Sequence, residues 1–147
     1  VTYSEAGHSW NTVYSRPLVA NGGIHNWEVE VVAGTCCPRG NTWHGIIGVA
    51  HEESRLSGWL SDGNSGNGYI MNGGKTNSGS RDAYGTSWGA GDRIRVRLDL
   101  DRGELRYYRN NVDQGLAANI DRNLTWRLAA SLGSSDTTYR LLRYWQE

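Results

Sequence analysis

The sequence predicts an all-β fold, an antiparallel β-sandwich of two sheets. Several segments alternate apolar and polar residues with a period of two, which is the pattern of a strand with one buried face. The composition of 20 glycines, 7 tryptophans and 8 tyrosines with only 2 prolines suits short strands joined by tight turns. Helical periodicity is almost absent, and two packed sheets are the architecture that accommodates such a pattern.

The first predicted strands lie in the N-terminal third of the chain. Residues 27–31 read WEVEV, so one face carries Trp27 and two valines while the other carries Glu28 and Glu30. We expect the tryptophan face in the core and the glutamates in solvent. Residues 45–50 read GIIGVA, a short apolar run that predicts a central strand covered on both faces.

The clearest predicted strand covers residues 93–101, which alternate apolar residues with arginines and aspartates. Residues 102–103 turn the chain back into a second strand at 104–109. The Asn110-Asn111 pair tolerates the positive φ of another tight turn, and a third strand follows at 112–116. The pattern predicts a meander.

The last predicted strands cover 127–132 and 138–145 and are joined by an exposed turn at 133–136. The segment between Glu52 and Trp88 is rich in Gly, Asn and Ser, and we expect loops there. We find no internal repeat, and 147 residues suit one domain with one core.

Charge and hydropathy restrict the possible partners. The charges of the 15 basic and 15 acidic residues cancel, and these residues are scattered along the chain. The sequence therefore lacks the basic patch that is typical of proteins that bind nucleic acids or anionic membranes. No apolar stretch approaches the roughly 18 residues that a bilayer span requires. The chain opens in polar sequence without an initiator Met, so we interpret it as a domain excised from a larger protein.

Residue spacing argues against metal sites and a disulfide framework. Cys36 and Cys37 are adjacent, and adjacent cysteines rarely bond each other, so we expect reduced thiols. The four histidines lie at no recurrent ligand spacing with them, and no cofactor is expected. Asp99 and Asp101 resemble the start of a calcium loop, but Arg102 would repel the ion, and a hairpin turn explains this segment better.

The pair Glu28 and Glu30 raises one catalytic alternative. Paired carboxylates can hydrolyse a glycosidic bond, but these would lie about 7 Å apart on one strand face and lack a third carboxylate at a sandwich glycanase's spacing. We therefore expect no enzyme activity. A carbohydrate-binding or carbohydrate-cleaving concanavalin-like sandwich remains the rival hypothesis.

The order of several motifs resembles the SPRY domain family over residues 15–142. The segments that carry the resemblance are RPL at 16–18, GIHNWEVEV at 23–31, GIIGVA at 45–50, Tyr84-Gly85 before Gly91-Asp92, and LDLDRGELRYYRN at 98–110. The last is similar to the family's most specific hairpin. The longer PRY-SPRY form is not recognisable before Ser15. The chain resembles the SPRY-only form, with an extension at 1–14, a core at 15–142 and a C-terminal end at 143–147.

The sequence departs from the family pattern in its aromatic residues. Tyr107 and Ala118 stand where the family usually has Phe, and Asn111 replaces a hairpin glycine. Asn tolerates positive φ better than other non-glycine residues. A buried Tyr107 needs a hydrogen-bond partner for its hydroxyl, which predicts a wetter core. We expect the tryptophans at family anchor positions, Trp27, Trp59 and Trp88, to be packing residues.

The resemblance implies a non-catalytic, intracellular and monomeric protein-interaction module, such as an adaptor domain for ubiquitin-ligase substrate recognition, a chromatin complex or a large channel. Its partner, a protein loop or a short extended peptide, would dock on loops at one end of the sandwich. The expected partner-binding residues are Thr42, Trp43, Gly133, Ser134, Ser135 and Asp136. Trp43 is the expected anchor, because exposed Trp residues dominate many interfaces. The second turn lacks the aromatic residue that accompanies a short Asn-rich peptide ligand in some members. A chiefly structural role in a larger assembly is the third alternative.

Overall fold

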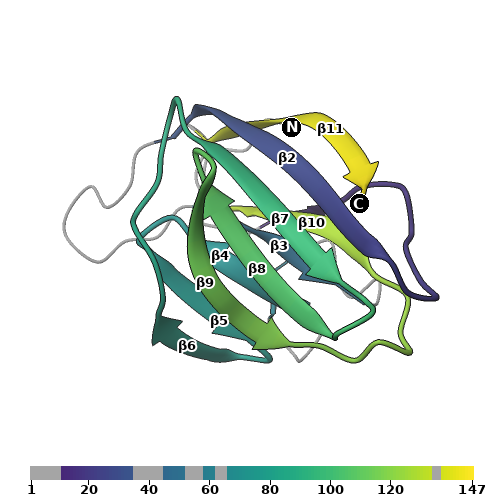
Figure 1. Ribbon diagram of the computed structural model, residues 1–147. Coiled ribbons are helices and arrows are strands. Elements are labelled where there is room, and N and C mark those ends of the chain that lie inside the picture. The colour runs from purple at the N-terminus through teal and green to yellow at the C-terminus, as the bar shows by residue number, and fades with distance from the viewer. Residues whose placement is uncertain (1–10, 35–44, 52–57, 62–65, 134–136) are drawn as a thin grey trace.

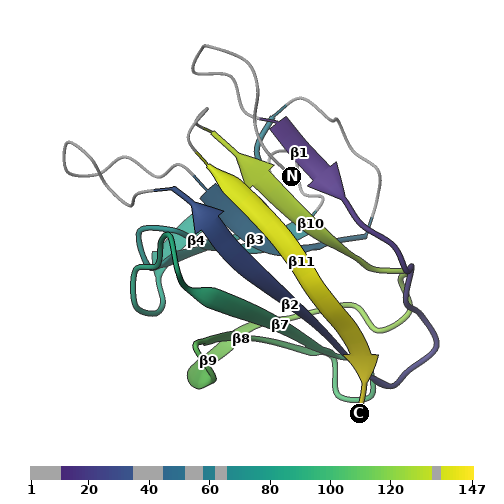
Figure 2. The same cartoon turned by 90° about the horizontal axis from the view of Figure 1, so that it is seen from above.

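The computed structural model describes residues 11–34, 45–51, 58–61, 66–133 and 137–147, which form eleven strands and no helix. The strands make two antiparallel sheets that pack face to face (Figures 1 and 2). This arrangement confirms the predicted all-β sandwich. No helix of the described residues is long and apolar enough to cross a membrane.

The two sheets contain six and five strands. The six-stranded sheet has the order β1 (Asn11–Tyr14), β10 (Arg127–Leu132), β3 (Gly45–Ala50), β4 (Gly66–Ile70), β5 (Gly74–Asn77) and β6 (Ser80–Ala83). The five-stranded sheet has the order β11 (Thr138–Gln146), β2 (Ile24–Ala33), β7 (Arg93–Asp99), β8 (Glu104–Arg109) and β9 (Val112–Asn119).

The strands predicted from alternation are present, and β3 is central and buried along its whole length. β7 ends two residues earlier than predicted, at Asp99, because the next residues belong to the turn that Gly103 completes with a φ of 72°. Asn110 and Asn111 adopt positive φ values of 49° and 67°, which confirms the predicted second turn.

The prediction of loops between Glu52 and Trp88 is wrong in part, because the three short strands β4, β5 and β6 lie in this segment. The glycines that suggested loops are required by the close approach of β3 and β4. A Cβ atom at Gly48 would lie 1.9 Å from the Asn67 carbonyl oxygen, and one at Gly68 would lie 2.2 Å from Ile46 Cγ2. Strand pairing therefore overrides the local preference for turns.

β1 lies in the segment predicted as an N-terminal extension, so the sandwich begins before Ser15. It pairs with β10 in a register that sets Tyr14 opposite Ala129. Its Thr12 hydroxyl lies 2.7 Å from the Ser131 hydroxyl in the interior. β1 is thus one of the two edge strands of the six-stranded sheet.

The core between the sheets is rich in large aromatic side chains. Trp27 and Trp88 are buried, and Trp59 is half-buried against a smaller cluster on the six-stranded sheet, so all three are packing residues as predicted. Tyr107 is fully buried, and its hydroxyl donates to the Asn67 carbonyl at 3.2 Å. The predicted partner for this tyrosine is therefore present.

The expectation that Glu28 faces solvent is wrong. It is only 6% exposed, since β11 lies beside β2 and the Arg143 Nε atom approaches the carboxylate to 2.9 Å. Glu30 pairs less closely with Arg140, at 3.3 Å. Alternation assigned both glutamates to the outer face, but the arginines of the neighbouring strand cover part of that face.

Replacing Trp27 by alanine should destabilise the fold by about 3–5 kcal/mol, because the truncation leaves a large cavity in the core. Trp145 on β11 is the matched control, since its half-buried indole lies under the Arg143 guanidinium at 4.3 Å on the outer face. Trp145→Ala should cost less than about 1 kcal/mol. Urea denaturation measures both, and equal losses would contradict the assigned strand faces.

Replacing Tyr107 by phenylalanine should lower the unfolding free energy by about 1–3 kcal/mol, because the buried Asn67 carbonyl loses its donor. Tyr108→Phe is the control, since Tyr108 is half-buried on the outer face under the Arg95 guanidinium. It should change stability by less than about 0.5 kcal/mol. Unchanged stability of Tyr107→Phe in thermal denaturation would show that the hydroxyl is dispensable.

Candidate functional site

The described residues that flank the two predicted binding segments lie at one end of the sandwich. β2 ends at Ala33, which pairs with Thr138 at the start of β11. β3 begins at Gly45, which pairs with Leu132 at the end of β10. We call this end, where β2 and β10 finish, the loop end.

Of the residues predicted to bind the partner, the structure describes only Gly133, which is half-buried at the loop end. The others lie outside the described residues, namely Thr42, Trp43, Ser134, Ser135 and Asp136. Cys36 and Cys37 also lie outside them. The convergence of these segments on one surface therefore stays a prediction.

Buried contacts hold the backbone at the loop end in place. The Met71 amide donates to the Gly45 carbonyl at 2.9 Å, and the Trp88 amide donates to the Met71 carbonyl at 3.0 Å. The Trp88 ring packs against Tyr139, with 6.1 Å between ring centroids. Because these side chains are buried, the backbone from which the loops depart is held by both sheets.

Asp92 fixes a second part of the backbone at the loop end. Its carboxylate accepts hydrogen bonds from the Gly89 amide at 2.9 Å and the Asn110 side chain at 2.8 Å, and Arg109 Nε lies 3.3 Å away. Partial burial opposes ionisation, but these donors and the guanidinium outweigh it and hold the pKa of Asp92 below its ordinary value. Asp92 therefore joins the turn before β7 to the β8–β9 hairpin.

A pocket of about 460 Å³ opens beside the loop end. It lies between the β4–β5 turn, strand β6 and the segment after β6. Its lining residues are Ile70, Asn72, Gly73, Gly74, Arg81, Asp82, Ala83, Tyr84 and Gly85. Sequence patterns predicted loops in this segment and no pocket, although the Asn72-Gly73-Gly74 run is typical of a tight turn.

Backbone hydrogen bonds fix the shape of the pocket. The Asn72 side-chain oxygen accepts from the Gly74 amide at 2.9 Å, and the Gly85 amide donates to the Gly73 carbonyl at 2.8 Å. Gly73 has a φ of 95°, and a Cβ there would lie 2.6 Å from the Gly85 carbonyl oxygen. The pocket is thus preformed, with small residues that leave room for a ligand.

The pocket is lined by a tyrosine, small residues and side chains of both charges. Tyr84 forms one wall and donates to the Gly115 carbonyl at 2.5 Å, while burial raises its pKa to about 12 and keeps its hydroxyl neutral. Arg81 and Asp82 place opposite charges on the exposed strand β6. Among the lining residues that the structure describes, Asp82 is the single carboxylate, so they provide no pair of carboxylates of the kind that glycoside hydrolysis uses.

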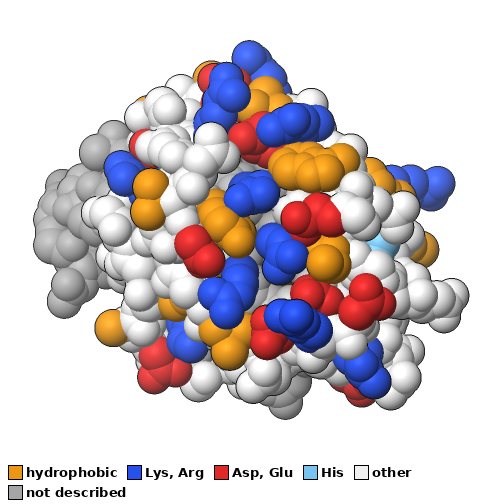
Figure 3. Space-filling model, in the orientation of Figure 1, with side chains coloured by type: hydrophobic (Ala, Val, Ile, Leu, Met, Phe, Trp, Pro, Cys, Tyr) orange, Lys and Arg blue, Asp and Glu red, His pale blue; other side chains and the backbone are white. Residues whose placement is uncertain are grey.

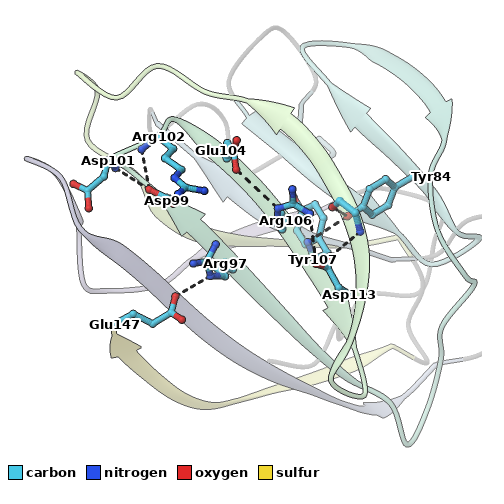
Figure 4. A network of polar contacts seen from close by, with 11 residues as sticks. Tyr84, Arg97, Asp99, Asp101, Arg102, Glu104, Arg106, Tyr107, Asp113 and Glu147 are labelled. Atoms are coloured by element: carbon cyan, nitrogen blue, oxygen red, sulfur yellow. Dashed lines mark hydrogen bonds and ion pairs between the residues drawn. The ribbon is translucent and has the colours of Figure 1, made fainter.

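The outer face of the five-stranded sheet carries interspersed charges of both signs (Figure 3). Arg106 lies 3.9 Å from Glu104 and 3.4 Å from Asp113, and Arg97 lies 2.8 Å from Glu147 (Figure 4). The two glutamates considered for glycosidase chemistry each face an arginine, as described above. Both carboxylates are therefore part of the ion pairs between β2 and β11.

Asp99 and Asp101 shape the β7–β8 turn (Figure 4). One Asp99 oxygen accepts from the amides of Asp101 at 3.0 Å and Arg102 at 2.9 Å. Asp101 accepts from the Gly23 amide at 2.9 Å. The Asp99 carboxylate closes the hairpin turn, as expected, and the Asp101 carboxylate joins that turn to the segment before β2. The described part of the chain contains no group of three or more potential metal ligands.

Comparisons with known proteins agree with this architecture. A family model described as SPRY domain matches residues 24–141. The SPRY domain of human HERC1 is 17% identical with a TM-score of 0.74, over 90% of this chain and 82% of that chain. Another human SPRY domain is 15% identical with a TM-score of 0.76, over 95% and 88% of the two chains. No curated protein sequence matches significantly.

Protonating Asp92 should weaken the loop end. Because its pKa lies below the ordinary value of 3.8 in the folded state, its stabilising contribution is present above that pH and is lost as the pH falls toward the folded value. Asp92→Asn should therefore lower the melting temperature clearly at about pH 6 and by less at about pH 3. A loss that is constant across this range in calorimetry would contradict the role of the charge.

Proposed function

Because this chain belongs to the SPRY domain family, whose members generally mediate protein–protein interactions, we propose that it is a non-catalytic module that binds a protein partner at the loop end. The family match covers most of the chain and includes β2, β3, β7 and β8. The partner, in this proposal, presents a loop or a short extended segment.

The preformed pocket beside the loop end carries this proposal. Protein surfaces bind with less loss of entropy when the receptor backbone is already fixed. Here the Gly73–Gly85 hydrogen bond and the Tyr84–Gly115 hydrogen bond hold the walls before any partner arrives. A partner side chain can enter beside Ile70, with polar contacts from Asn72 and the pocket rim.

The remaining contacts are assigned by analogy with the family. Trp43 and Thr42 precede β3, and the turn at 133–136 follows β10, so both segments adjoin described residues of the loop end. Trp43 would be the anchor of the interface, since tryptophans that become buried on binding are common hot spots. Arg39 and Asp136 would lie at the rim and affect mainly the association rate.

The rival carbohydrate function finds little support among the described residues. The glutamates that could have served as catalytic carboxylates are held by arginines, and the aspartates that suggested calcium bind backbone amides. A glycan array separates the two hypotheses. Saturable binding of a defined glycan would favour the rival.

Affinity capture with matched variants tests the proposal. The immobilised domain, Trp43→Ala, Asp82→Arg and the outer-face control Arg106→Ala are each exposed to the same cell lysate, and captured proteins are quantified by mass spectrometry. A true partner should be retained by the wild type and by Arg106→Ala, because exposed ion pairs contribute little to the fold. It should be depleted from Trp43→Ala and Asp82→Arg.

Calorimetry with the purified partner then measures how much binding free energy each variant loses. Trp43→Ala should weaken binding by about 2 kcal/mol, roughly thirtyfold, with an unchanged melting temperature. A lower melting temperature with unchanged affinity would make Trp43 a core residue instead. Unchanged affinity in both Trp43→Ala and Asp82→Arg would place the interface away from the loop end.

A further inference from the structure

Toward its C-terminus, the outer edge of β11 faces no partner strand among the residues that the structure describes. Among the described strands, β11 has one neighbour, β2, although it is nine residues long. The Glu147 amide donates to the Ile24 carbonyl of β2 at 2.9 Å. Because successive residues of a strand point their backbone groups to alternate sides, those of Tyr144 and Gln146 point away from β2. Such an edge is a template for another strand.

An apolar groove of about 90 Å³ lies beside this edge, between the two sheets. Its lining residues come from β1, β2, β10, β11 and the residue after β1, and they are Val13, Tyr14, Ser15, Val29, Leu128, Ala130, Tyr139 and Leu141. Leu141 is 43% exposed. Figure 2 looks onto β11 with β10 and β1 beside it. The groove can accept apolar side chains from a strand placed along β11.

The charges next to the edge favour an acidic neighbour. Arg140 and Arg143 lie on the outer face of β11, and their side chains are 64% and 62% exposed. A bulge between Leu141 and Arg143 aligns the two arginines with Glu30 and Glu28 of β2, which lie two residues apart. A further strand with acidic residues at alternate positions would continue this ladder of opposite charges.

We propose that β11 accepts an added strand from a protein partner, an extended segment that alternates acidic and apolar residues. Its acidic side chains face Arg140 and Arg143, and its apolar side chains enter the groove at Leu141. A second copy of β11 fits poorly, because antiparallel self-pairing sets these arginines against arginines. This site lies on a strand edge and is independent of the pocket at the loop end.

Fluorescence anisotropy with a synthetic peptide tests the proposal. The probe is a capped, fluorescein-labelled peptide of alternating glutamate and valine, with the nine-residue length of β11. It should bind with a dissociation constant below about 1 mM. A peptide with lysine in place of glutamate should bind at least tenfold more weakly, and so should one with the same composition in two blocks.

Charge-reversal variants give the matched control. Arg140→Glu should weaken the glutamate peptide at least tenfold and strengthen the lysine peptide. Arg93→Glu makes the same charge change on the same outer face, two strands from the edge, and should alter binding by no more than twofold because the distance approaches a Debye length. Thermal denaturation verifies that both variants fold. Equal effects of the two variants would overturn the proposal.

Amide hydrogen exchange gives a second readout on the wild-type chain. The Tyr144 amide should exchange quickly in the free protein and become protected when the glutamate peptide is added. Protection in the free chain would show that the edge is already occupied, by another part of this chain or by a second copy, and sedimentation distinguishes these two occupants. Protection in the free chain or absence of peptide binding would each overturn the proposal.

Discussion

Buried tyrosine hydroxyls, each of which requires a hydrogen-bond acceptor, connect the two sheets of this protein. The chain contains no phenylalanine, so tyrosines occupy its large aromatic core positions together with tryptophans. The Tyr107 hydroxyl donates from β8 to the Asn67 carbonyl of β4. The Tyr69 hydroxyl of β4 donates to the Thr86 carbonyl and lies 3.5 Å from Gln114 Oε1 of β9. An unmet buried polar group costs about 1–3 kcal/mol, so these contacts restrict how the sheets can shift.

The same constraint shapes the candidate binding site. Tyr84 packs edge-on against Tyr69 and Tyr107, and its hydroxyl donates to the Gly115 carbonyl of β9. One face of this tyrosine therefore belongs to the core while the residue also lines the pocket. Lys75 forms a second link between the sheets, because its Nζ atom donates from β5 to the Ala117 carbonyl of β9 at 2.9 Å. The pocket derives its fixed shape from contacts that also hold the sheets together.

Sequence patterns predicted the strands whose alternation reflects burial, such as β7, and missed those whose composition reflects a close approach. Gly68 lies in β4 because the Ile46 side chain of β3 leaves no room for a Cβ atom there, a fact that only the strand pairing reveals. Alternation assigned Glu28 to the outer face, but its burial depends on Arg143, which is 115 residues away. Resemblance to the family predicted Trp43 as a contact residue. The pocket at Asn72 could be recognised only from the folded backbone.

In our proposal, a protein partner binds the loop end of a rigid sandwich. Hydrogen exchange of the domain, measured by mass spectrometry with and without the captured partner, tests it most directly. We expect protection confined to Asn72–Gly74, Asp82–Gly85 and the segments next to Gly45 and Leu132, with exchange in β7 and β8 unchanged. Protection centred on the charged outer face of the five-stranded sheet, with none at the pocket, would contradict it.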